Sequence, residues 1–129
     1  MAADVVYVVD GGLAMYNLGL LALGATEPAH IGYGTGTTAA VATNTALETA
    51  RDEARTDGTS SAETTTTTGD TYQVTGVIAC ATSSAAIAEV ALFDAATTGN
   101  MFLRATHDVI NLNVADSIAY TIKSVLNQA

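Results

Sequence analysis

Two apolar runs that flank a short turn, Ile87–Phe93 and Met101–Ala105, constrain the fold of this chain more than any other stretch. Gly99 lies in the turn and supplies the backbone freedom that a hairpin turn requires. Side chains alternate with a period of two, and one face carries Val90, Leu92, Met101 and Leu103. The opposite face carries Glu89, Phe93, Phe102 and Arg104. The pattern predicts a β-hairpin in a packed sheet, with Ala86–Phe93 and Met101–Thr106 as neighbouring strands.

The hairpin also predicts a structural ion pair. Antiparallel pairing places Glu89 opposite or nearly opposite Arg104. A cross-strand pair of this kind contributes about 0.2–1 kcal/mol and helps to fix the register. This geometry accounts for both charges, so we do not interpret them as a catalytic pair.

The rest of the chain after residue 29 predicts short strands joined by turns. The expected strands or extended segments are His30–Tyr33, a hairpin formed by Thr64–Thr68 and residues 71–81 around Gly69-Asp70, Val109–Val114, and Ser117–Val125. Gly58–Ser61 is expected to be a loop, and Thr43–Arg55 either a short helix or an exposed edge strand. Six to eight short strands at regular spacing predict a mainly β fold, an antiparallel β-sandwich or jelly roll.

The N-terminal part differs from this pattern. Asp4–Val9 is a short strand or an apolar arm, and Asp10 is a candidate N-cap. Helical spacing of leucines then predicts one short helix from about residue 12 to 23, stopped by Gly24. We therefore expect an N-terminal arm and helix over residues 1–29 and a β-sandwich domain over residues 30–129.

Composition restricts the possible partners. Hydrophobic residues make up 49% of the 129-residue chain but aromatic residues only 5%, so the core consists of small side chains and extra burial between subunits is favoured. Thirteen acidic residues against four basic ones give a net charge of −9, which argues against direct nucleic-acid binding and against anionic membranes. Leu13–Ala25 is too short to span a membrane, and the N-terminus lacks the basic region of a secretory signal.

Candidate chemical groups are few. Cys80 lies in an apolar run and is expected to be a small buried side chain, and His30 and His107 are expected to be surface or turn histidines. Three aspartates adjoin turns and are expected to accept backbone hydrogen bonds, with calcium binding between loops as the alternative: Asp70, Asp94 and Asp108. The sequence therefore predicts no enzyme, no cofactor and no resident metal ion.

A glycine-rich stretch, Gly34–Ala39, has the letters of a dinucleotide-binding pattern (GTGTTA), with Glu53 at a suitable distance. That pattern signals nucleotide binding only inside a strand–turn–helix unit backed by further parallel strands. The chain shows no second unit of this kind, so we interpret the stretch as a flexible or tight turn.

Four motifs together resemble a group of small virion proteins of tailed phages. In order they are Ile31–Ala40 (IGYGTGTTAA), Thr45–Thr49 (TALET), Ala88–Ala96 (AEVALFDAA) and Gly99–Thr106 (GNMFLRAT), followed by a last strand that Asp116 precedes. The chain departs from the family pattern at Ala50, Ala91 and Ala115, where an acidic residue, a glycine and a glycine are usual. The match runs from about residue 30 to residue 125.

The resemblance implies a structural part of a phage or archaeal virus particle. Small size, acidity and an N-terminal apolar extension suit a capsid decoration (cement) protein on the outer capsid surface, bound to the major capsid protein. Such proteins commonly form trimers, so a homo-oligomer is expected. The alternative is a tail, baseplate or receptor-binding component of the same kind of virion.

The N-terminal segment is the expected assembly contact, either on the shell or between protomers. The residues expected to make it are Val5, Val6, Tyr7, Val8, Val9 and Leu13. Asp4–Val9 could also add to a neighbour's sheet through main-chain hydrogen bonds. The competing interpretation is that the helix simply closes one end of the sandwich.

Overall fold

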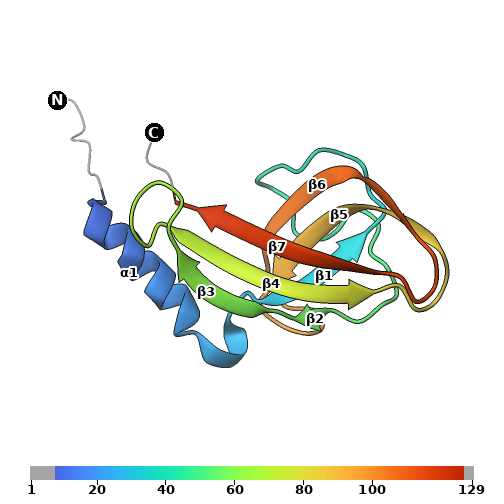
Figure 1. Cartoon of the computed structure of the whole chain (residues 1–129), viewed down its shortest axis with the longest axis horizontal. Coiled ribbons are helices and arrows are strands. Elements are labelled where there is room, and N and C mark those ends of the chain that lie inside the picture. The colour runs from blue at the N-terminus through green and yellow to red at the C-terminus, as the bar shows by residue number, and fades with distance from the viewer. Residues whose placement is uncertain (1–7, 127–129) are drawn as a thin grey trace.

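The computed structural model describes residues 8–126 and contains two antiparallel sheets and one helix near the N-terminus (Figure 1). The first sheet, in spatial order, contains β2 (Thr56–Asp57), β1 (His30–Gly34), β5 (Ala85–Phe93) and β6 (Met101–Leu112). The second contains β3 (Thr59–Glu63), β4 (Thr71–Ala79) and β7 (Ser117–Val125). The predicted fold class, a mainly β antiparallel sandwich with one short N-terminal helix, is confirmed.

The predicted hairpin is the pair β5–β6, with Leu92 opposite Leu103. β6 is longer than predicted and includes most of the extended segment expected at Val109–Val114. An irregularity at the turn end places Phe93 opposite Met101, so β6 carries one extra residue there, Phe102. An extra residue reverses the alternation of side chains. The predicted face of Met101 and Phe102 is therefore wrong, and the Phe102 ring instead meets that of Tyr72 on β4 edge-on, 6.0 Å between centroids.

The core lies between the two sheets and is made of small and medium side chains. One cluster contains Ala29, Ile31, Tyr72, Val74, Val90, Leu92 and Ile122. A second contains Tyr33, Ile78, Cys80, Ile87 and Leu112. The chain passes from β2 to β3 at Gly58, where a Cβ would collide with the Val74 side chain. The residues after Gly58 form β3, so the loop predicted at Gly58–Ser61 is wrong.

The threonine run Thr64–Thr68 lies in the loop of a hairpin, not in a strand. The hairpin joins β3 to β4, and the Asp70 carboxylate accepts backbone hydrogen bonds from Thr65, Thr66 and Thr67 at 2.9, 3.1 and 2.9 Å. These hydrogen bonds hold the pKa of Asp70 well below its ordinary value, and the bond from Thr65 has the largest effect. A side chain that binds neighbouring N–H groups competes with strand pairing, and here it overrides the β propensity of threonine.

Helix α1 (Asp10–Leu21) begins two residues before the predicted start, so Asp10 is its first residue and not its N-cap. The short 3₁₀ helix η1 (Gly24–Thr26) follows. α1 lies beside β3 and β4 (Figure 1) and buries Leu13 together with Asn17, whose amide donates to the carbonyl of Gly69. Leu20 and Leu21 pack against the first core cluster, so this side of the helix covers one end of the sandwich.

Residues 35–55, which we call the strap, connect β1 to β2 and contain neither a helix nor a strand. The helix or edge strand predicted for Thr43–Arg55 is therefore wrong. One isolated bridge, between Gly34 and Ala50, ties the strap to β1. Most of its remaining backbone bonds are made to side chains, which the next section describes.

Candidate functional site

The sequence motifs meet around one buried carboxylate, that of Glu89 on β5. Glu89 is fully buried and accepts hydrogen bonds from the backbone N–H groups of Glu48 (2.8 Å) and Thr49 (3.0 Å) in the strap. The Arg104 Nε on β6 lies 3.2 Å from Glu89 Oε1 and completes the predicted ion pair. Arg104 stands opposite Ala91 in the register, one diagonal step from Glu89. This carboxylate therefore joins the strap to the central hairpin.

Arg104 and Glu48 extend this cluster into the strap. The Arg104 side chain is 3% exposed and donates to Asn44 Oδ1 at 3.2 Å and to the Thr38 carbonyl at 2.9 Å. The Glu48 carboxylate accepts the N–H groups of Thr37 and Thr38. Hydrogen bonds from Thr38 and then Thr37 lower the pKa of Glu48. The cluster is therefore a set of matched charges and hydrogen bonds that holds backbone in place.

The glycine-rich stretch has a structural explanation in the same cluster. A Cβ on Gly36 would collide with Glu89 Oε2 and with the Glu48 side chain. The N–H groups that a phosphate would use at such a turn are bonded to the Glu48 carboxylate. Glycine is thus required here by close packing against two carboxylates.

The other two arginines fasten the rest of the strap. Arg51 Nη2 donates to the Ser83 carbonyl at 2.7 Å and pairs with Glu53 at 3.0 Å. Arg55 Nη1 donates to the carbonyls of Ala95 (2.8 Å) and Thr98 (2.7 Å) in the β5–β6 turn. Its guanidinium also lies 3.4 Å from the centroid of the Phe93 ring. Sequence reasoning missed both anchors, because their partners are more than 30 residues away.

Three buried polar atoms near this region have no hydrogen-bond partner among the described residues: Tyr33 Oη, Arg51 Nε and Glu53 Oε2. Burial, and then the nearby Glu53 charge, raises the pKa of Tyr33 to about 12. Burial opposes ionisation of Glu53, but hydrogen bonds from Arg51 and the Ala81 N–H outweigh it and lower its pKa. A phenol with a raised pKa stays protonated at neutral pH, so Tyr33 is not an activated nucleophile.

The single residues considered from sequence lie in separate places. Cys80 is 1% exposed and donates to the Ser83 carbonyl, which confirms that it is buried. His30 Nδ1 lies 2.6 Å from Asp57 on the neighbouring strand and is half-buried, so it is neither a surface nor a turn residue. Asp94 accepts hydrogen bonds from Asn100, which lower its pKa. Within residues 8–126, no three histidine, cysteine or acidic side chains are grouped to hold a metal ion.

The N-terminal residues expected to make the assembly contact divide into three groups. Val5, Val6 and Tyr7 lie outside the described residues. Leu13 is buried inside the chain at 6% exposure, while Val8 is half-buried and Val9 is 72% exposed. The helix and the residues that flank it expose further apolar side chains. We define the α1 patch as Val9, Met15, Tyr16, Leu18 and Leu23.

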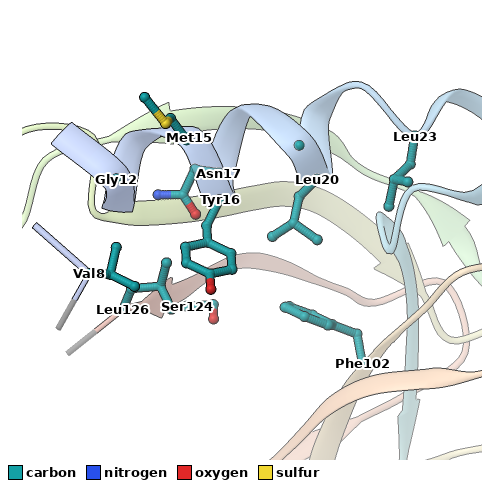
Figure 2. Close-up of a pocket in the computed structure, with 11 residues that line it drawn as sticks. Val8, Gly12, Met15, Tyr16, Asn17, Leu20, Leu23, Phe102, Ser124 and Leu126 are labelled. Atoms are coloured by element: carbon teal, nitrogen blue, oxygen red, sulfur yellow. The ribbon is translucent and has the colours of Figure 1, made fainter. Parts of the chain in front are cut away.

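A groove of about 770 Å³ lies beside the α1 patch (Figure 2). Tyr16 and Leu20 reach into it from α1, Leu23 reaches into it from the turn after α1, and Phe102 closes it from β6. Met15 also lines the groove, from the outer side of the helix (Figure 2). The sequence predicted an apolar contact on this segment but not which side of α1 would be exposed, because apolar residues lie on every side of the helix.

Among residues 8–126, no helix combines the length and apolar character needed to cross a membrane. Comparison with protein-family models, with curated proteins and with solved structures gave no match to this chain.

Proposed function

We propose that this protein is a virion structural protein, a capsid decoration protein that binds the outer shell and stabilises it. Its partner is the major capsid protein, and the contact is the α1 patch. The observation that carries the proposal is the exposure of this patch: Met15 is 72% exposed and Leu18 is 59% exposed.

Three properties of α1 support a docking role. A helix that is apolar on all sides is normally buried, yet α1 leaves one side open. Residues 11–26 contain no charged side chain, in a chain with a net charge of −9. Contiguous exposed apolar surface of this kind usually marks an interaction site.

The motif resemblance supports the virion assignment. The recurring glycine, glutamate and arginine positions lie at Gly36, Glu48, Glu89 and Arg104, and they fasten the strap to the sandwich. Motifs of this type maintain a rigid scaffold, which suits a protein whose work is assembly.

The test measures binding of the purified protein to capsids that lack it. A variant with Met15→Gln and Leu18→Gln keeps good helix formers and removes two exposed apolar side chains, so we expect it to fold and to bind at least about tenfold more weakly. Val77→Thr is the matched control, since Val77 is 55% exposed on β4. Unchanged occupancy of the glutamine variant would contradict the proposed contact.

Copy number separates the two virion roles. A decoration protein is present in hundreds of copies per particle, whereas a tail, baseplate or receptor-binding component is present in few. Quantitative mass spectrometry of intact virions measures this directly. A low copy number would favour the tail alternative.

A further inference from the structure

Met15 in the α1 patch carries the most accessible sulfur atom of the described residues. Of the three methionines in the chain, Met1 lies outside the described residues. Met15 is 72% exposed, whereas Met101 at the start of β6 is half-buried and Cys80 is buried. Figure 2 shows the Met15 side chain on the outer side of α1. Small solutes in water can therefore reach its thioether.

The neighbouring turns of the helix leave this thioether uncovered. A helical side chain leans toward the N-terminus over the preceding turn, and residues three and four apart are neighbours on the helix surface. For Met15 the preceding turn contains Gly11 and Gly12. The residue four positions later is Gly19, so Leu18 is the one neighbour of the four that has a side chain.

Packing within the described residues does not explain two of these glycines. A Cβ added at Gly11 or at Gly19 would meet no atom within 4 Å. Glycine inside a helix costs about 0.5–1 kcal/mol relative to alanine. The chain thus carries two unfavourable helix residues that fill no close contact, and their shared consequence is open access to Met15.

Oxidation at this position changes the chemistry of the patch. A peroxide transfers one oxygen atom to the thioether: the O–O bond breaks, an S=O bond forms, the sulfur loses two electrons and hydrogen peroxide is reduced to water. The sulfoxide is polar, whereas the thioether is apolar. Residues 11–26 contain no charged side chain, so an apolar contact here offers the sulfoxide oxygen little to replace its bonds to water.

We propose that Met15 is a reversible oxidation site that controls docking of the α1 patch. The reduced thioether packs against the shell, and the sulfoxide keeps the protein off it. A thiol-dependent methionine sulfoxide reductase returns two electrons, and the oxygen leaves as water. Docking covers Met15, so bound copies are protected and free copies respond. The inference rests on the proposed function and adds its regulation.

The test treats the full chain with hydrogen peroxide and locates the added oxygen by peptide mass spectrometry. We expect Met15 to react at least about fivefold faster than Met101 in the folded protein. The oxidised protein should bind capsids at least about fivefold more weakly, and methionine sulfoxide reductases should restore binding. Met15→Leu is the matched control, because it keeps an apolar side chain together with Met1, Met101 and Cys80. It should bind normally and stay insensitive to peroxide.

A second variant tests the role of the glycines. In Gly19→Leu the new side chain leans over Met15, and it should slow oxidation of Met15 at least about twofold while the circular dichroism spectrum stays unchanged.

Three results would overturn the inference: equal reaction rates for Met15 and Met101, unchanged capsid binding after oxidation, or equal loss of binding in Met15→Leu. The glutamine variant at Met15 and Leu18 separates the two proposals. If it fails to bind while oxidised wild-type protein binds, the docking site stands and the oxidation site is wrong. If it binds normally, both are wrong.

Discussion

Removing the charge of Glu89 tests whether the buried cluster holds the strap to the sandwich. Glu89→Gln keeps the shape of the side chain but loses its charge, and it brings an amide toward donors that need an acceptor. The affected donors are the backbone N–H groups of Glu48 and Thr49 and the guanidinium of Arg104. Since the Arg104 side chain is 3% exposed, water cannot readily replace the lost acceptor.

The expected cost follows from these three contacts. Leaving a buried donor unsatisfied costs about 1–3 kcal/mol, and removing one partner of a buried ion pair costs about 3–5 kcal/mol. Because the glutamine still offers one acceptor, we expect Glu89→Gln to lower the free energy of unfolding by about 2–4 kcal/mol. Arg104→Met leaves the buried Glu89 carboxylate without its cation and with only two backbone donors. It should lower the free energy of unfolding by about 3–5 kcal/mol.

The double variant distinguishes a coupled pair from two independent residues. With both charges removed, neither partner is left buried and unpaired, so the double variant should cost about 1.5–3 kcal/mol less than the sum of the single changes. Urea unfolding is measured for the wild type, the two single variants and the double variant. Circular dichroism is the signal, because the chain has no tryptophan whose fluorescence could report unfolding. Glu63→Gln is the control, since Glu63 is an exposed carboxylate on β3 bonded to Ser61.

Two results would refute this reasoning. One is a change for Glu89→Gln no larger than that for Glu63→Gln, which should stay within about 0.5 kcal/mol. The other is additivity of the two single changes within about 0.5 kcal/mol. Either result would mean that the strap is held by contacts other than the Glu89–Arg104 pair.

Three further outcomes are expected. Gly36→Ala should lower the free energy of unfolding by about 1–3 kcal/mol, because the added Cβ collides with two carboxylates. Gly19→Ala should raise the free energy of unfolding by up to about 1 kcal/mol, because Gly19 has open space around it in α1 and alanine favours a helix; urea unfolding measures both variants. The pKa of Asp70 is depressed in the folded chain, so its contribution is present above the ordinary value of 3.8 and is lost as the pH falls below it; Asp70→Asn should flatten this acid-side loss in a pH series of unfolding curves. The pKa of Tyr33 is raised from 10.0 to about 12, so stability falls as the pH rises above 10.0 and the unfolded chain ionises first; Tyr33→Phe should make that alkaline fall shallower.

The fold class could be predicted because its main signals are local. Alternation in β5 and β6 and the turn at Gly99 lie within one stretch of chain, and they determine the hairpin. The bulge at Phe102 could not be predicted, because one inserted residue leaves no compositional trace but reverses a face. Threonine propensity likewise failed at Thr64–Thr68, where one carboxylate, Asp70, captures the backbone.

The buried cluster could be predicted only in part. The Glu89–Arg104 pair follows from the register of the hairpin, which is a local property. The partners in the strap are 40 or more residues from Glu89, and no periodicity connects them. The letters of Gly34–Ala39 suggested a ligand site, whereas the packing of Gly36 against Glu89 explains the glycine without one.

The use of its few cations also restricts how this protein can associate. All three arginines are directed at strap and turn backbone, so most acidic side chains on the surface have no basic neighbour, and copies repel one another over most orientations. A contact at the α1 patch adds no repulsion of its own, because residues 11–26 contain no charged side chain. At 1 M salt, where charges are screened beyond about 3 Å, the repulsion between the acidic surfaces outside the patch is reduced, so an apolar contact at the α1 patch is strengthened.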